Sequence, residues 1–341
     1  MKQPIIILGQ GLAGSTLAMR FFDQGKDFLV IDNGRKNSSS EVAAGMWNPI
    51  VFRKLNKSWK ADELLPELES FYRDCEKKID KKILHPLKIG RVHSSKFESD
   101  LWLEKRSLPG FEAYLGNESK VPEGFKDPEN GISIVHKAGY VDLIPFLKGV
   151  ENLLLEKDKL RIEELDEDEI LQEFSDCTII DCRGYRCADS KWWSYLPFGK
   201  TKGEVLTISC KKLPLDDVFN AGFFVCPLGN DLFRLGATFN WDEEDSVPTA
   251  KGKEQLVNKL KKWMDKPFSV VDHRAGIRPT VADRRPMIGK HPEIENLYLF
   301  NGLGTKGVMI APYLSKVFLD CVLREKSFPD EVNLERWKRK R

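Results

Sequence analysis

The pattern of apolar and polar residues at the start of the chain predicts a βαβ unit. Residues 5–8 form an apolar run of the length of one buried strand, and residues 28–31 form a second run that ends at Asp32. Between them, Gly9-x-Gly11-x-x-Gly14 predicts a tight turn and a helix that packs closely on the first strand. Backbone N–H groups at such a helix start bind phosphate, and an acid after the second strand accepts hydrogen bonds from ribose hydroxyls. The pattern therefore predicts a dinucleotide site with Asp32 on the ribose.

Later segments alternate between helical and strand periodicity. Apolar positions at three-to-four spacing predict helices over residues 59–78 and 253–264, and a helix that starts in residues 138–142 and buries Leu143 to Leu154. Short apolar runs predict strands at residues 87–89, 91–93, 132–135, 159–162, 178–184, 203–208, 223–227 and 233–238. The last three are expected to pair antiparallel. We therefore predict an α/β fold, in which a Rossmann-like nucleotide-binding domain carries an inserted domain of antiparallel sheet plus helix.

Composition is consistent with a two-domain cytoplasmic protein. The chain has 341 residues, of which 41% are hydrophobic. No apolar run approaches the roughly 20 residues of a membrane span. The short apolar run at the start of the sequence does not look like a secretory signal. The seven cysteines are odd in number and scattered, which predicts reduced thiols. The histidines show no ligand spacing, so no metal is predicted. A net charge of +2 does not indicate a polyanionic partner. The basic residues 336–341 are expected to be a solvated tail, with contact to nucleic acid or lipid head groups as the alternative.

Two clusters of motifs carry a family resemblance. The first consists of the glycine motif, Asp32 and Ser39-Ser40-x-x-Ala43-Ala44-Gly45-Met46. The second consists of Ala275-Gly-Ile-Arg278-Pro279, Ala282-Asp283-x-x-Pro286-Met-Ile-Gly289 and the run from Gly302 to Pro312. In order and spacing they resemble the D-amino-acid oxidase superfamily, which includes the bacterial glycine oxidases and the flavin domain of the bifunctional tRNA methylaminomethyluridine enzyme. Since both clusters must meet at one FAD, residues 1–80, 137–200 and 272–341 are expected to form the FAD-binding domain. Residues 81–136 and 201–271 are expected to form the substrate domain.

The resemblance implies FAD, and a non-covalent link, because no cysteine or histidine lies in the loop 302–307. An NAD-binding dehydrogenase shares the first motif, but residues 39–46 and the loop 302–307 favour FAD. The resemblance gives Gly184 a place near the pyrophosphate, with an ordinary strand terminator as an equal alternative. The residues expected to contact the cofactor are Gly9, Gly11, Leu12, Ala13, Gly14, Asp32, Asn33, Ser39, Ser40, Ala44, Gly45, Met46, Gly184, Gly302, Leu303, Gly304, Thr305, Lys306, Gly307 and Val308.

The resemblance also implies catalytic roles. Arg278 would grip a substrate carboxylate through the two parallel hydrogen bonds that a guanidinium can donate; the alternative is a structural ion pair with Asp283. Lys306 and the amides of its loop would stabilise negative charge on reduced flavin, unless Lys306 is a surface lysine. In the substrate pocket, Met46 and Trp47 would lie near the flavin ring, with core packing as their alternative. Phe224 takes the place of a tyrosine in glycine oxidases, which argues against glycine as the substrate.

The function implied by the resemblance is FAD-dependent oxidation of an amino acid or secondary amine. A hydride leaves the α-carbon for the flavin, water hydrolyses the imine, and oxygen is the expected electron acceptor. Two other classes remain open: a tRNA-modifying flavoenzyme that acts on a carboxymethylaminomethyl group, and a flavin-bearing binding protein without turnover. A tRNA partner requires a basic face around the pocket, which the charge of +2 does not indicate. The sequence does not predict the oligomeric state.

Overall fold

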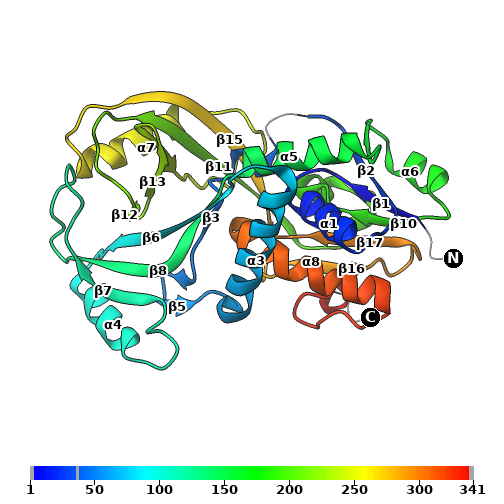
Figure 1. Ribbon diagram of the computed structural model, residues 1–341, viewed down its shortest axis with the longest axis horizontal. Coiled ribbons are helices and arrows are strands. Elements are labelled where there is room, and N and C mark those ends of the chain that lie inside the picture. Colours follow the sequence, from blue (N-terminus) through cyan, green and yellow to red (C-terminus); the bar gives the residue numbers. More distant parts are fainter. Residues whose placement is uncertain (1–3, 36–37, 338–341) are drawn as a thin grey trace.

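A computed structural model describes residues 4–35 and 38–337 and contains two large sheets (Figure 1). The six-stranded sheet has the order β16-β17-β10-β1-β2-β9. Its strands are β1 (Ile5–Leu8), β2 (Phe28–Asp32), β9 (Leu160–Ile162), β10 (Thr178–Asp181), β16 (Met287–Lys290) and β17 (Leu297–Asn301). All neighbours pair in parallel except β16 with β17. The carboxyl ends of β1, β2 and β10 therefore lie at one edge, where parallel α/β sheets bind ligands.

Helices cover both faces of this sheet because the strands are apolar on both sides. On one face, a core of buried side chains joins the sheet to α1 (Leu12–Asp23), α3 (Ala61–Ile79), α5 (Leu143–Glu156) and α8 (Gly307–Arg324). On the other face lie α6 (Glu167–Glu173) and the short helices η1 (Gly184–Asp189), η2 (Lys191–Trp193) and η4 (Leu334–Trp337). A Cβ on Gly14 would lie only 1.8 Å from the carbonyl oxygen of Gly9, so α1 can begin this close to β1 only with glycine there.

The second sheet is nine-stranded and mostly antiparallel, with the order β15-β11-β14-β13-β12-β6-β8-β3 and β7 beside β8. Its strands are β3 (Met46–Trp47), β6 (Leu84–Val92), β7 (Leu115–Ser119), β8 (Ile132–Val141), β11 (Phe198–Ser209), β12 (Val218–Asn220), β13 (Phe224–Gly229), β14 (Leu232–Gly236) and β15 (Ser269–Val281). Helix α7 (Ala250–Trp263) packs on it through Leu256 and Leu260. Smaller elements complete the chain: α2 (Ser39–Val42), the pair β4 (Ile50–Val51) and β5 (Asn56–Lys57), α4 (Lys96–Arg106) and η3 (Gly304–Lys306).

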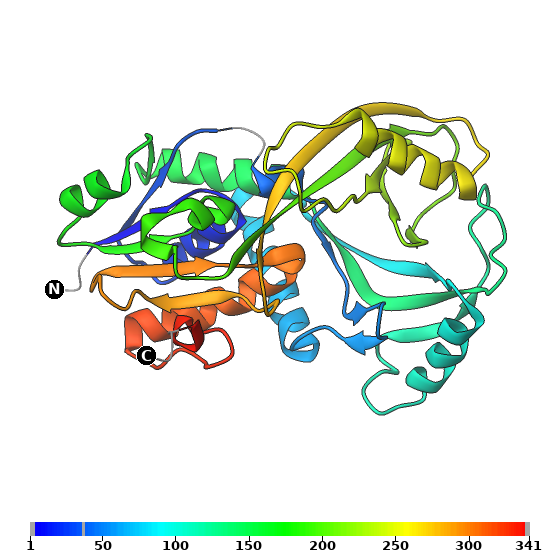
Figure 2. The ribbon, with the colours of Figure 1, turned by 180° about the vertical axis from the view of Figure 1, so that it is seen from behind.

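Strands β11 and β15 form a long antiparallel ribbon that runs from the part of the molecule with the six-stranded sheet into the part with the nine-stranded sheet (Figure 2). All strands of the six-stranded sheet come from residues 1–80, 137–200 and 272–341, whereas β3 and parts of β8, β11 and β15 extend from these ranges into the second sheet. We keep these ranges as the proposed FAD-binding domain, and residues 81–136 and 201–271 as the proposed substrate domain.

Most elements predicted from periodicity are present. The expected helices are α3 and α7, the run at residues 159–162 is the parallel strand β9, and β11, β13 and β14 pair antiparallel as expected. The helix start expected in residues 138–142 was wrong: β8 continues to Val141, paired with Leu84, and the helix begins at Leu143. Pairing with β6 outweighs the local signal here. The runs at residues 87–89 and 91–93 belong to one strand, β6, interrupted by a register shift after Leu87.

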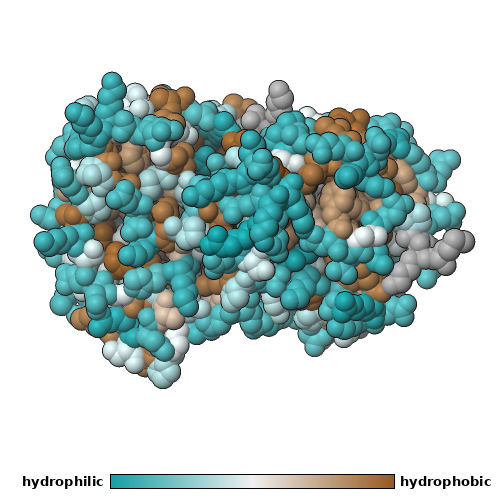
Figure 3. Space-filling model, viewed as in Figure 1, coloured by the Kyte–Doolittle hydropathy of each residue, from teal (hydrophilic) through white to brown (hydrophobic). Residues whose placement is uncertain are grey.

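The surface is mainly hydrophilic on the face shown in Figure 3, with separate apolar patches. Across residues 4–35 and 38–337, none of the helices combines the length and apolar character needed to cross a bilayer. Of residues 336–341, Arg336 and Trp337 lie in η4, and Arg336 pairs with Asp283 at 2.8 Å. Residues 338–341 of the expected tail lie outside the described residues.

Candidate functional site

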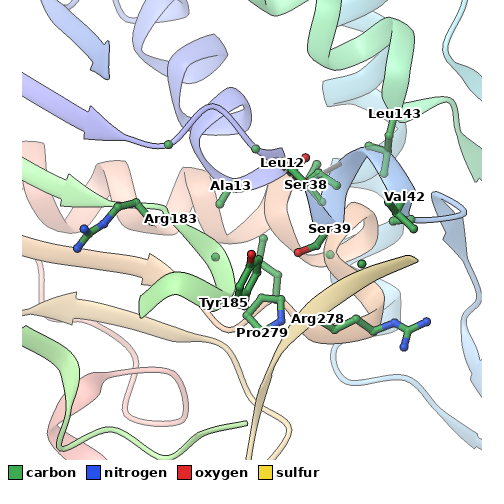
Figure 4. A pocket seen from close by; sticks show the side chains of 18 of the residues that line it. Leu12, Ala13, Ser38, Ser39, Val42, Leu143, Arg183, Tyr185, Arg278 and Pro279 are labelled. Carbon is green, nitrogen blue, oxygen red and sulfur yellow. Dashed lines mark hydrogen bonds between the residues drawn. The ribbon is translucent and has the colours of Figure 1, made fainter. Parts of the chain in front are cut away.

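A cavity of about 570 Å³ lies where the two motif clusters meet (Figure 4). Its walls come from the β1–α1 turn, the end of β2, α2, the end of β10, the β11–β15 ribbon and the loop before α8. In Figure 4, Arg183 and Arg278 lie at opposite ends of the view, with Leu12 and Ser39 between them. The volume is in the range of roughly 300–1,000 Å³ that cofactor and small-molecule sites occupy.

The β1–α1 turn and the end of β2 have the geometry expected of a nucleotide site. Gly9 adopts a φ of 96° and donates its N–H to the carbonyl of Ile31 at 2.7 Å. The carboxylate of Asp32 accepts hydrogen bonds from the backbone N–H groups of Gln10 and Gly34, both at 2.8 Å. A carboxylate has about four acceptor positions, so these two bonds fix its orientation and leave acceptor capacity for ribose hydroxyls.

Charged residues that sequence reasoning did not single out line the same end of the cavity. Arg35 and Arg186 both pair with Glu164, at 2.6 and 2.9 Å. Arg183 follows β10 and pairs with the fully buried Asp181 at 2.7 Å. Burial alone would raise the pKa of Asp181, but the charge and hydrogen bonds of Arg183 hold it below its ordinary value. This ion pair therefore fixes the turn between β10 and η1.

Arg278 lies on β15 in register with Thr201 of β11. A Cβ on Gly203 would be 2.0–2.1 Å from Cζ and from both terminal nitrogens of Arg278, so the guanidinium lies flat on the β11 backbone. The Phe239 ring lies 4.6 Å from Cζ, and Nη1 donates to the carbonyl of Thr238 at 3.4 Å. Among the described residues no carboxylate pairs with Arg278, and burial lowers its pKa to about 10. The ion pair with Asp283 considered above does not form; Asp283 pairs with Arg336 instead.

Lys306 is the second desolvated cation of the cavity. It stands directly before α8, and its Nζ donates to the carbonyl of Asn48 at 3.2 Å and to the hydroxyl of Ser58. Burial lowers the pKa of Lys306 to about 8, and within the described ranges it has no acidic partner. The surface lysine considered as an alternative is therefore not what the structure contains.

The structure brings most of the predicted site residues together. Every expected cofactor contact lines the cavity except Gly14, which packs α1 against β1, and Gly302; Phe224 and Met46 line it too. Trp47 does not line it. Its side chain is 5% exposed and packs in the core between the six-stranded sheet and helices α1, α3, α5 and α8, and its Nε1–H donates a hydrogen bond to the carbonyl of Lys137 at 3.0 Å. Met46 and Trp47 are neighbours on β3, and successive side chains on a strand point to opposite faces. The expectation that both would line the pocket therefore needs correction.

Part of the cavity wall was missed from the sequence. It comprises residues of β11 and of the segment after β14, namely Gly203, Val205, Ala237, Phe239 and Ser246. A glycine inside an apolar strand often marks a close backbone approach, and this signal at Gly203 was available. The segment after β14 has no periodic pattern that would have identified it.

The described residues contain no group of three or more metal-ligating side chains, and all seven cysteines are free thiols. Cys182 lines the cavity and is buried, and burial raises the pKa of its thiol well above the ordinary value. A thiol in this state is a poor nucleophile.

Comparisons with known proteins agree with this geometry. Residues 4–320 match the family described as FAD dependent oxidoreductase. The bifunctional protein ThiO/ThiG of Nostoc is 24% identical over 364 aligned positions, which cover 96% of this chain and 54% of that protein. The tRNA 5-methylaminomethyl-2-thiouridine biosynthesis bifunctional protein MnmC of Idiomarina loihiensis is 29% identical over 36% of this chain and 21% of its own length. The chain thus spans about half the length of ThiO/ThiG, and its match to MnmC covers a smaller share of that protein.

A solved structure supports the same fold. The glycine oxidase of Geobacillus kaustophilus superposes with a TM-score of 0.78 over 96% of both chains, at 16% identity.

Proposed function

We propose that this chain, which belongs to the family of FAD-dependent oxidoreductases, oxidises an amino acid or a secondary amine that carries a carboxylate. The observation that carries the proposal is Arg278, a largely desolvated cation in the wall of the cavity for which the described residues provide no ion pair. A buried charge is costly unless it is paired. A substrate carboxylate would supply the missing partner, and the fork of a guanidinium would fix its orientation.

The cavity fits FAD. We propose that the amides at the start of α1 hold the pyrophosphate, that Asp32 holds the adenosine ribose, and that the loop 302–308 lies along the flavin. The positive end of α1 and the φ of Gly9 suit a phosphate close to the backbone. When bound, FAD supplies the acceptor for the hydride that leaves the substrate α-carbon. The flavin loop contains neither cysteine nor histidine, so we propose non-covalent binding.

The residues of the chain position the substrate and stabilise charge. Arg278 holds the carboxylate and thereby directs the α-carbon, which replaces a bimolecular encounter by a fixed geometry. Lys306, as a cation near the flavin, stabilises the negative charge that oxidation of the substrate delivers. Apolar residues of the wall, among them Val205 and Phe224, exclude water during hydride loss. The amine nitrogen releases its proton to solvent, the imine is hydrolysed by water, and oxygen takes up the electrons.

Anaerobic flavin reduction tests this proposal. We expect an amino acid or secondary amine from a panel of glycine, sarcosine, D-amino acids and polyamines to bleach the flavin. Arg278→Ala should lower kcat/KM roughly a hundredfold or more with normal flavin content, because it removes one partner of a desolvated charge pair. Arg278→Lys should rescue little, since a point charge does not reproduce the fork.

Three results would contradict the assignment. Unchanged turnover in Arg278→Ala would mean a plain amine substrate, loss of flavin from that variant would mean a structural arginine, and no bleaching by any amine would favour a binding protein.

A second candidate function is oxidation of a carboxymethylaminomethyl group, which the likeness to MnmC over 36% of the chain supports. Modified nucleosides in the same panel test it.

A further inference from the structure

Two large aromatic side chains stand exposed next to Arg278. Phe239 lines the cavity and is 53% exposed, so it lies at the opening. Trp241 is 70% exposed, and its ring stacks on that of Phe239 with centroids 6.4 Å apart and an interplanar angle of 24°. The two rings therefore form a continuous apolar surface that extends from Arg278 to the solvent.

The segment that carries these rings is firmly anchored. The backbone of Asn240 exchanges two hydrogen bonds with Lys202 of β11, at 2.8 and 2.9 Å. The Lys202 side chain, only 1% exposed, donates to Glu243 at 2.6 Å and to Asp245 at 2.7 Å. Because the chain is fixed on both sides of Trp241, its backbone keeps the indole ring at the surface of the protein. Exposed apolar groups held in this way mark binding surfaces.

The charges around the two rings disfavour an anionic ligand group. Glu243 and Asp245 pair with Lys202, and Glu244 pairs with Lys200 at 2.8 Å. Each lysine is shared by two carboxylates, because Asp189 also pairs with Lys200 at 2.7 Å, so these carboxylates keep a net negative charge that repels an anionic group. An aromatic or bulky aliphatic group would instead remove apolar ring surface from water and stack on it.

We propose that Phe239 and Trp241 form a subsite for an apolar, preferably aromatic, group of the substrate. The inference rests on the proposed function, because it takes the carboxylate of the same molecule to be bound by Arg278. The Phe239 ring lies 4.6 Å from Cζ of Arg278, and the Trp241 ring is the next step outward. Phe239 is therefore next to the proposed carboxylate anchor, and Trp241 extends the same aromatic surface. The substrate class is then an aryl- or alkyl-substituted amino acid or secondary amine, larger than glycine.

Two non-oxidisable acids test the subsite in the holoenzyme. Propionate and 3-phenylpropionate share the carboxylate and differ in the ring, and their binding is followed by the change in visible absorbance of the bound flavin. We expect the wild type to bind 3-phenylpropionate roughly tenfold more tightly. Trp241→Ala should reduce this preference to about twofold and leave the propionate affinity unchanged. Phe97→Ala, which removes a 74% exposed aromatic ring on α4, is the matched control and should change neither affinity.

The outcomes separate this inference from the proposed function. If propionate binds but the ring confers no preference, or if Trp241→Ala keeps the full preference, the subsite is refuted and the carboxylate anchor stands. If neither acid binds, the anchor and the subsite both fail. If Trp241→Ala changes the oligomeric state in size-exclusion chromatography and leaves the preference intact, the rings are a protein interface and the subsite is refuted.

Discussion

Replacing Gly203 by alanine should displace Arg278 without unfolding the protein. The added Cβ would lie 2.0 Å from Nη2 and 2.1 Å from both Cζ and Nη1 of Arg278. Non-bonded heavy atoms settle at roughly 3.5 Å or more, so the guanidinium must retreat by about 1.5 Å. The obstructed atoms are the end of a flexible side chain, and the strand can therefore keep its place.

The expected cost is large because hydrogen bonds to a carboxylate tolerate little displacement. A shift of about 1 Å in a positioning group can cost roughly a hundredfold in rate. We expect kcat/KM for a carboxylate-bearing substrate to fall by about tenfold to a hundredfold in Gly203→Ala, with unchanged flavin content and a melting temperature close to that of the wild type. Steady-state oxidation and thermal unfolding of the same preparation measure both.

Two further variants show whether the effect passes through Arg278. Gly199 lies on the same strand, but a Cβ added there would meet the hydroxyl of Thr280 at 2.8 Å and not the guanidinium of Arg278. The activity of Gly199→Ala should therefore remain near that of the wild type. In the Arg278→Ala background, Gly203→Ala should cause no additional loss, because residues that act as one unit are not additive. An unchanged kcat/KM in Gly203→Ala would refute the placement of the anchor, and a further loss in the double variant would assign Gly203 a separate role.

Three other predictions concern the cofactor. Burial lowers the pKa of Lys306 to about 8, so the side chain is a cation at pH 7 and largely neutral at pH 9. Lys306→Met should therefore lower the reduction potential of bound flavin at pH 7, with a difference from the wild type that shrinks as pH rises through 8; an equal difference at both pH values in a spectroelectrochemical titration would contradict this. Asp32→Ala should weaken FAD binding about tenfold or more, because ribose hydroxyls lose a charged acceptor, and fluorescence titration of the apoprotein measures it; an unchanged Kd would move the ribose elsewhere. Acid precipitation should release a yellow supernatant, whereas colour retained in the pellet would mean a covalent link.

The glycine turn was predictable because its signals are local. A strand, three glycines, a helix and an acid follow one another within residues 5–32, and each has a steric or electrostatic reason for its position. Arg278 and Lys306 were singled out through the resemblance of their short motifs to the family, and their roles stay predictions. The sequence also indicated that the two ends of the chain share one ligand, and the cavity lined by both agrees with that expectation.

The surroundings of Arg278 depend on long-range register and were not predictable. Gly203 meets the guanidinium only because Thr201 of β11 pairs with Arg278 of β15, and no local pattern sets that pairing. Phe239 belongs to a segment whose position follows from backbone bonds between Asn240 and Lys202. Trp47 follows the alternative of core packing, because side chains alternate along β3 and Met46 takes the side that faces the cavity.

The order of the six-stranded sheet has a consequence for biosynthesis. Strand β10 lies between β1, which precedes it in the chain, and β17, which follows it much later, and α8 then packs on α1. A nascent chain therefore cannot complete the cavity until the residues of β17 and the start of α8 have left the ribosome. Chains that stop before β17 would expose β10 as an apolar edge strand, which is open to pairing with other chains. Truncated products of this protein should consequently aggregate even when their glycine turn has formed.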